Sequence, residues 1–599
     1  MKKRKGIAII LLATLVMTGC GKAGDIRDLE NSGDGNNTET VTDTTETPEA
    51  VDETGADETP AQDDTEGNEE ESEEVAEAAD PEHPVPIQVN LVKHSKTYYA
   101  ETDYQYRSVA ECEAVSVVLA DESAELYPEL AIELEDKNEA EKQNVISACE
   151  EFVNSYYYES EDERQYYDEN DITLSEVGSR VITRADSNIL SMYDPWYSYY
   201  GGVHGMYGKF GNSYDTRTGE ELKFSDVVVD PQAFFRFANE RIQEQYGGND
   251  YEQPADITEY LADFNDDTVL SWWVDYQGVT IYFGPYELGS YAMGAVETKI
   301  FFSEAPQLFN PLYTYVPDSY VIPMTEMTEL LLDMDGDGVI EYISYEEVQD
   351  PESEYEFNCT DVYVNGDKLT VDGWHYLSDN YIAFLEGKYY FVTFRTAEGD
   401  WCYTSIANLT DMKSLDATVE SNGFASYGYT SDYGDDGYCY YEYSTAQFTD
   451  PNLIRMNKNS DFLGTMSGNV DCHMDSNGNI LANSNQCLFN AYYAMKAKKD
   501  IVCKQVDYSG NVVGETKIKA GSYYAVLRGD CKTYADLVEI SENEIDTNDY
   551  YYPLLEEGRT LRESDVLYRL EGAYQEDSYY LLIGDEPVSD LFENIMYAG

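Results

Sequence analysis

The chain has 599 residues and a formal net charge of -81, because 118 Asp and Glu residues outnumber 37 Lys and Arg residues. Such a charge repels nucleic acids and anionic wall polymers, so we expect no nucleic-acid partner. It favours cationic proteins, cationic peptides and divalent ions as ligands. The length allows several domains, and 56 tyrosines are spread along it.

The first twenty residues, MKKRKGIAIILLATLVMTGC, begin with a basic segment and continue with an apolar stretch from Ile7 to Val16. That stretch is too short to span a bilayer comfortably, and small residues follow it just before Cys20. The pattern resembles a bacterial lipoprotein signal over 1–20, in which Cys20 is diacylated with palmitate-like chains and becomes the mature N-terminus. We therefore expect a lipid-anchored protein at the extracytoplasmic face of the cell membrane.

Residues 21–85 are rich in Asp and Glu. Between Asp25 and Glu82 they include one basic residue, Arg27, and no aromatic residue. Such a segment cannot bury enough apolar surface to offset its ordering entropy, and like charges keep it extended. The composition predicts a disordered acidic linker that spaces the folded part from the membrane. A cation-binding role for the linker is the alternative.

Nine further cysteines follow Cys20, and none belongs to a C-x-x-C pair, which argues against a zinc ribbon or a thioredoxin-like site. Disulfides form outside the cytoplasm, but an odd count leaves at least one thiol free, and the spacing does not reveal the pairing. The nine are Cys112, Cys149, Cys359, Cys402, Cys439, Cys472, Cys487, Cys503 and Cys531.

Residues 86–315 alternate apolar and polar side chains in short runs, which predicts strands. One helix is predicted over 139–157, and a second begins after Asp230, which suits the N-cap and precedes a proline. A β-hairpin is predicted over 270–283. Helices packed on a mainly antiparallel sheet make an α+β domain.

Three stretches of this region follow one another in a familiar order: "GGVHG", then "NSYDTRTGEELKFSDVV" with the helix after it, then "GVTIYFGPYELGSYAMGAVETKIFF". Together they resemble the extracellular domain of the RsiV-type anti-sigma factors, over about 86–310. The resemblance implies a single α+β domain without enzymatic activity, which in the anti-sigma members binds lysozyme as a signal. Only the basic segment Met1 to Lys5 and Gly6 precede the apolar stretch here, so we expect no anti-sigma role, and lysozyme or another cationic protein is the expected partner.

His204 is the candidate for a catalytic base. A general base needs a group that orients it and a nucleophile or water within reach. The sequence has no GxSxG or HExxH motif, and its five histidines are scattered singly. Gly201, Gly202 and Gly205 indicate a tight backbone around His204. We therefore expect a structural histidine and no enzymatic activity, with a partner contact as the alternative role.

Gly284-Pro285-Tyr286-Glu287 follows a predicted strand, where a loop can carry recognition. Nearby tyrosine and tryptophan side chains would add rigid, amphipathic contact area. The alternative is a plain turn with a half-buried tyrosine. The predicted partner-binding residues are Pro285, Tyr286, Glu287, Tyr291 and Trp196.

The sharpest local motif is "DMDGDGVIE" at 333–341, in which oxygen ligands alternate and two glycines permit a turn around a calcium-sized cation. The EF-hand version needs a glutamate where Ser344 stands, and the flanking sequence is strand-like. The loop therefore resembles the short calcium loops of FG-GAP-type propeller blades, with a solvated acidic turn as the alternative. The predicted calcium ligands are Asp333, Asp335, Asp337, the carbonyl of Val339, and Glu341.

Short strands alternate with turn residues through 320–490, which favours a second, β-rich domain built as a propeller or a sandwich. Within 495–599, "KIKAGSYYAVLRGDCKTYADLVEI" resembles part of a small SH3-like β-barrel. The expected fold class is thus multidomain: an α+β domain over 86–315, then a β-rich region that ends in a small barrel.

These observations favour a lipid-anchored surface protein that binds a partner and has no catalytic activity. A cell-wall-active hydrolase or deacetylase accessory protein is the first alternative. It would need a metal-binding Asp and His set in a TFDDGP-like context, which the sequence lacks. A scaffold that positions other surface proteins is the second alternative.

Overall fold

The structure is a computed structural model that describes residues 80–596 apart from short gaps. Cys20 and nearly all of the predicted linker lie outside the described residues. Among the described residues, no helix is long and apolar enough to cross a membrane. The gaps fall at 102–105, 247–252, 267, 326–328, 354, 398–401, 416–419, 422–423, 434–436, 547–552 and 575–580.

The first sheet of the described chain has eight strands in the order β20-β21-β1-β2-β3-β5-β4, with β6 also paired to β5. Its pairs are antiparallel except β2 with β3, which are parallel and are connected through helices. The strands are β1 (Val89–Glu101), β2 (Tyr106–Leu119), β3 (Leu174–Gly178), β4 (Val181–Ala185), β5 (Ile189–Tyr199), β6 (Met206–Asp215), β20 (Ser426–Tyr433) and β21 (Tyr438–Ala446).

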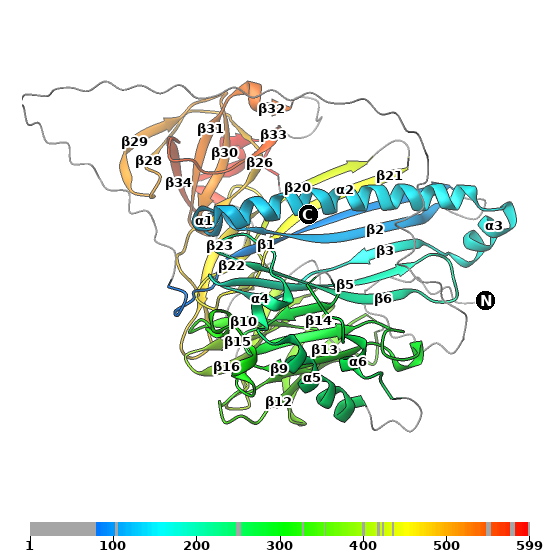
Figure 1. The fold of residues 1–599 in the computed structure, drawn as a ribbon. Helices are drawn as coiled ribbons and strands as arrows, with labels where there is room; N and C mark the ends of the chain where they lie inside the picture. Colours follow the sequence, from blue (N-terminus) through cyan, green and yellow to red (C-terminus); the bar gives the residue numbers. More distant parts are fainter. Residues whose placement is uncertain are drawn as a thin grey trace, which may run out of the picture. The chain divides into compact units, whose positions relative to one another are not determined.

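Helix α2 (Pro128–Tyr158) lies along this sheet, over β1 and β2 (Figure 1). It contains the helix predicted over 139–157 and begins eleven residues earlier, in a charged stretch where Leu130 and Leu134 are buried and Ile132 is exposed. The burial of these two leucines shows why the helix extends beyond the periodic part of its sequence. The shorter helices are α1 (Asp121–Leu126), α3 (Glu161–Asn170), α4 (Phe224–Val227), α6 (Ile257–Tyr260) and α7 (Val588–Leu591).

A second, three-stranded sheet is formed by β7 (Ser271–Val274), β8 (Gly278–Phe283) and β9 (Val296–Phe301), and α5 (Pro231–Tyr246) packs against β9. The predicted hairpin is confirmed as β7 and β8. The predicted helix is confirmed as α5, and the Ala233 amide donates to Asp230 Oδ1 at 2.9 Å, which is the expected N-cap bond.

The remaining strands form four sheets. One is a six-stranded sheet of β10 (Tyr320–Met324), β15 (Leu377–Leu385), β16 (Lys388–Thr396), β17 (Cys402–Asn408), β18 (Lys413–Leu415) and β19 (Glu420–Ser421). Another is a four-stranded sheet of β11 (Leu330–Leu332), β12 (Glu341–Gln349), β13 (Phe357–Val364) and β14 (Asp367–His375). A small sheet contains β26 (Ala491–Tyr493), β32 (Ile545–Asp546) and β33 (Leu554–Arg559).

The largest sheet has thirteen described strands. They are β22 (Ile454–Ser460), β23 (Met466–Met474), β24 (Ile480–Ala482), β25 (Cys487–Phe489), β27 (Met495–Ala497), β28 (Ile501–Val506), β29 (Val512–Ile518), β30 (Tyr523–Gly529), β31 (Tyr534–Ile540), β34 (Leu567–Tyr574), β35 (Leu581–Ile583), β36 (Glu586–Pro587) and β37 (Phe592–Glu593).

A β-rich architecture of several sheets with few helices is confirmed, whereas the boundaries predicted from sequence are not boundaries of strand pairing. Strand β21, from the predicted domain 320–490, pairs with β1 of the predicted domain 86–315. One hydrophobic core runs from Val321 to Phe592, across the boundary predicted between 490 and 495. The strands of 495–599 share a sheet with β22–β25, and the described pairings close no separate small barrel. Pairing partners far apart in sequence leave no local pattern, so composition could not place these boundaries.

A buried polar network around His94 connects β21 to β1. His94 on β1 is 0% exposed, and its Nδ1 lies 3.1 Å from Glu442 Oε2 on β21. Its Nε2 lies 2.8 Å from Asn138 Oδ1 on α2 and 3.1 Å from Ser116 Oγ on β2. Because buried polar groups are costly without partners, these contacts specify one register for four elements at once.

Strand β6 approaches β7 so closely that only glycine fits at one position. A Cβ on Gly211 would lie 1.9 Å from the carbonyl oxygen of Trp272 and 2.5 Å from its carbonyl carbon, both backbone atoms. The Gly211 amide donates to Ser271 Oγ at 3.1 Å, which holds the two sheets together at this point.

We predict that Gly211→Ala destabilises the fold by about 2 kcal/mol or more, since neither backbone can yield without strain. The matched control is Gly514→Ala in β29, where an added Cβ meets nothing within 4 Å. Urea unfolding followed by tryptophan fluorescence measures both variants. Equal midpoints for Gly211→Ala and Gly514→Ala would contradict the close approach.

Candidate functional site

Four aromatic side chains from β6, the turn before it and the loop between β8 and β9 gather at one place: His204, Tyr207, Tyr286 and Tyr291, here called the tyrosine cluster. The Tyr291 ring stacks on His204 with centroids 4.4 Å apart, and lies 5.4 Å from the ring of Tyr286 and 6.3 Å from that of Tyr207. Tyr207 is 38% exposed and Tyr286 is 42% exposed. The cluster therefore offers aromatic surface to solvent while its rings support one another.

The glycines around His204 create the space for this packing. A Cβ on Gly205 would lie 2.4 Å from the ring of Tyr197, so a larger residue would displace that ring. His204 Nδ1 lies 2.9 Å from the Gly205 carbonyl oxygen, which also accepts a hydrogen bond from the Tyr291 hydroxyl at 3.4 Å. These local contacts agree with the structural role expected for His204.

The loop after β8 holds Tyr286 outward. Tyr286 has φ +76°, a left-handed conformation that costs energy for a residue with a side chain. Glu287 Oε2 accepts the Gly284 amide at 2.6 Å, and Leu288 is buried while its carbonyl accepts the Ala255 amide at 2.8 Å. Pro285 is buried, so its side chain forms part of the support under the cluster and not of its surface.

Trp196 does not join the tyrosine cluster. On β5 it pairs with Gly208, and the neighbouring pair is Tyr197 with Tyr207. Successive pairs of an antiparallel ladder point to opposite faces, so Trp196 and Tyr207 lie on opposite faces of the sheet. The Trp196 ring stacks on Phe210 at 5.8 Å. Of the five residues predicted for partner binding, the structure brings together Tyr286 and Tyr291, with Glu287 beside them.

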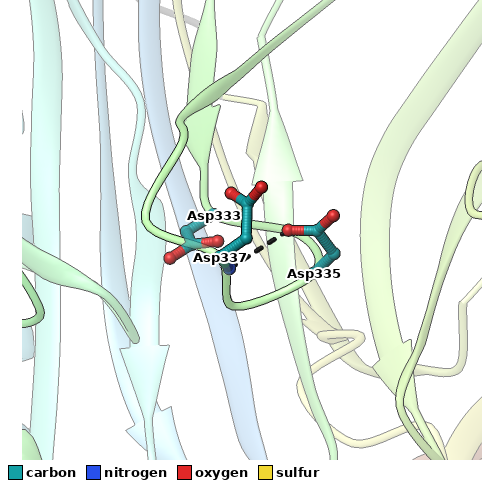
Figure 2. A group of neighbouring side chains, drawn as sticks. All are labelled: Asp333, Asp335 and Asp337. Carbon is teal, nitrogen blue, oxygen red and sulfur yellow. Dashed lines mark hydrogen bonds between the residues drawn. The ribbon is translucent and has the colours of Figure 1, made fainter.

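The acidic motif after β11 forms a turn that gathers three carboxylates. One oxygen from each of Asp333, Asp335 and Asp337 lies within 4.8 Å of the others. Figure 2 shows the three side chains gathered around the turn, with the Asp337 amide donating to Asp335 Oδ1 at 3.1 Å. Gly336 and Gly338 have φ of +74° and +83°, as the turn requires.

Glu341, a further predicted ligand, lies outside this group of three carboxylates. Glu341 Oε2 accepts the Met334 amide at 2.8 Å, so this carboxylate braces the turn. Val339 is exposed, and its amide donates to Asp337 Oδ1 at 2.7 Å. The structure therefore brings together three of the four predicted carboxylate ligands.

The base of the acidic turn is docked on the β7–β8 hairpin. The Asp333 amide donates to Gln277 Oε1 at 2.8 Å, and Gln277 Nε2 donates to the Asp333 carbonyl at 3.2 Å and to the Tyr389 hydroxyl at 3.1 Å. Asp333 Oδ1 is buried and has no hydrogen-bond partner among the described residues. A carboxylate oxygen in that position is costly unless a proton or a cation reaches it.

Hydrogen-bond contacts connect Ser116 to His94 and His94 to Glu442, in the order of the nucleophile, base and acid of a catalytic triad. This arrangement is relevant to the expectation that the protein has no catalytic activity. However, Ser116 is buried within β2, and its hydroxyl donates to Glu141 Oε2 at 2.5 Å. Burial raises the pKa of Glu442, but the hydrogen bonds from Tyr440 and Lys142 outweigh it and hold that pKa below its usual range. The arrangement connects β1, β2 and β21 through polar contacts of the buried His94 side chain.

Residues 225–303 match the family model described as "Protein of unknown function (DUF3298)". This segment includes α5, β7, β8 and β9 together with the loop that carries Tyr286 and Tyr291. No curated protein matches the chain.

Two crystal structures of DUF3298 family members are similar to this chain, one from Bacteroides fragilis and one from Pseudomonas aeruginosa. Each is 17% identical with a TM-score of 0.27, and each match covers 39% of this chain and respectively 96% and 98% of the solved chain.

Proposed function

We propose that this protein is a lipid-anchored cell-surface binding protein that recognises a cationic protein through the tyrosine cluster. The observation that carries the proposal is a set of aromatic rings that contact Tyr291, of which Tyr207 and Tyr286 remain exposed. Tyrosine provides large contact area at a low cost in conformational entropy, and its ring face attracts ammonium and guanidinium groups. The net charge of -81 adds long-range attraction for a cationic partner.

Lysozyme is the first candidate for that partner. The resemblance to the extracellular domain of RsiV-type anti-sigma factors supports this choice, and the segment matched by the family model lies within the resembling region. Tyr286 and Tyr291 both fall inside the matched segment. Their exposed or partly exposed rings give the candidate partner a contact surface on this chain.

We predict that the full chain binds lysozyme, and that the double variant Tyr286→Ala, Tyr291→Ala weakens binding at least about tenfold, as the loss of a central aromatic contact does. Biolayer interferometry at two salt concentrations measures both affinities. The control Tyr508→Ala removes a tyrosine that is 46% exposed and lies far along the chain, and it should leave the affinity unchanged. Wild-type binding weaker than about 1 mM would remove lysozyme as the partner.

We further propose that the acidic turn binds calcium, as the loops of FG-GAP-type blades do. Carboxylates of Asp333, Asp335 and Asp337 would supply hard oxygen ligands, and the buried Asp333 Oδ1 would gain the charge partner it lacks. Because Gln277 and Tyr389 brace Asp333, a bound ion would stabilise the joint between the β7–β8 hairpin and the strands after it.

The expected calcium affinity is on the order of 10⁻⁴–10⁻³ M, the range of extracellular modules. Calcium in excess should raise the melting temperature of the wild-type chain, since a ligand that binds only the folded state stabilises it. Asp335→Asn should abolish this rise, whereas Asp367→Asn, which changes an exposed aspartate at the start of β14 and outside the motif, should keep it. Calorimetry without heat at millimolar calcium would reject the site.

Cys20 is the proposed point of lipid attachment, on the basis of the sequence alone. In cells fed labelled fatty acid, the wild-type chain should carry the label and sediment with membranes, whereas Cys20→Ser should lose the label. A control at Cys503, which lies buried in β28, should keep it. A wild-type chain without label would contradict the lipid anchor.

A separate assay tests the proposed absence of catalysis. Release of soluble fragments from purified peptidoglycan by the chain would contradict it.

A further inference from the structure

Two cysteines meet beside the turn that joins β30 and β31. The Sγ atoms of Cys487 and Cys531 share a hydrogen bond at 3.2 Å, although the residues are 44 positions apart in sequence. Cys487 begins β25 and pairs with Gly529, the last residue of β30. Since Cys531 follows Gly529 by two positions, the strand register itself brings the two thiols together.

The turn holds the Cys531 sulfur in place. Cys531 has φ +63°, a left-handed conformation that a residue with a side chain adopts only where its surroundings impose it. The preceding carboxylate imposes it: Asp530 Oδ1 accepts the amides of Lys532, Thr533 and Tyr534 at 2.9, 2.6 and 3.0 Å. The thiol of Cys531 therefore points at Cys487 through a rigid backbone.

The two thiols differ in access and acidity. Cys531 is partly exposed and Cys487 is buried. The hydrogen bond with Cys487 holds the pKa of Cys531 below its usual range, and the charge of Lys458 acts in the same direction. The same hydrogen bond and burial raise the pKa of Cys487. The accessible thiol is thus the one that forms a thiolate and reacts first.

We propose that Cys487 and Cys531 form a disulfide in the exported protein, by exchange with an external disulfide such as oxidised glutathione. The Cys531 thiolate attacks one sulfur of that disulfide and releases one thiolate, which leaves a mixed disulfide on Cys531. Cys487 then loses its proton and attacks Cys531 Sγ, which releases the second thiolate. The two electrons and two protons of the cysteine pair pass to the external disulfide, which becomes two thiols.

The bond would tie β25 to the β30–β31 turn and close the chain segment between them. A cross-link over a segment of this length stabilises a fold mainly by restricting the unfolded chain. Cys472 on β23 is the competing partner, because its charge when ionised is close enough to raise the pKa of Cys487. Cys472 is, however, fully buried, and burial raises its pKa to about 11.

The test is a peptide map of the purified full chain after treatment with oxidised glutathione, with free thiols alkylated before digestion. We expect a peptide pair that joins Cys487 to Cys531 and separates on reduction, and a higher melting temperature for the oxidised chain. Cys531→Ser should lose the pair, and the control Cys503→Ser, whose thiol lies 3.8 Å from the Thr516 carbonyl, should keep it.

Alkylation of both Cys487 and Cys531 in the treated wild-type chain would overturn the proposal, as would a peptide pair that joins Cys487 to Cys472. These readouts use the wild-type chain, so they stand even where Cys531→Ser fails to fold. The proposal rests on export of the protein. The purified chain could form the disulfide with oxidised glutathione while thiol trapping in cells finds both cysteines reduced. That result would overturn export of the protein, whereas the pairing geometry would still hold.

Discussion

The pairing of β21 with β1 is the constraint on which the described fold depends most. It places residues 438–446 beside residues 90–98, and the buried His94 connects both strands to β2 and α2. Without β21, the amides and carbonyls along one edge of β1 would face solvent, and His94 would lose its carboxylate partner. The region that resembles an extracellular binding domain is therefore completed by β21, a strand from much later in the sequence. An isolated 86–315 fragment would expose the unpaired backbone edge of β1, to which another chain can pair.

The contact between β6 and β7 explains how the two candidate sites are supported. The close approach of β6 to β7 at Gly211 joins the large sheet to the three-stranded one. The tyrosine cluster lies where β6 begins, near the loop between β8 and β9 of that smaller sheet, and the acidic turn is docked on its β7–β8 hairpin through Gln277. The three-stranded sheet thus supports both the tyrosine cluster and the acidic turn, so a distortion of this sheet would affect both sites.

Features set by neighbouring residues could be predicted from sequence. Asp230 and Pro231 mark the start of α5, the 270–283 hairpin forms, and the glycines of the acidic turn adopt the left-handed φ that the motif needs. Features set by distant residues could not be predicted. The outward or inward direction of Trp196 depends on sheet register, the burial of Pro285 depends on the packing around its loop, and the joining of the predicted domains depends on β21.

The distribution of charge strengthens the case for a cationic ligand beyond what the total suggests. Three of the largest fully buried side chains are Arg184, Arg395 and Arg528. Arg184 binds Asp186 and two backbone carbonyls, and Arg528 binds Asp536, so these scarce positive charges neutralise interior groups. Lys299 is likewise buried against Asp275. Because Arg184, Arg528 and Lys299 are buried together with aspartates, the exterior keeps the strong acidic excess of the chain, which a cationic protein or a divalent ion can balance.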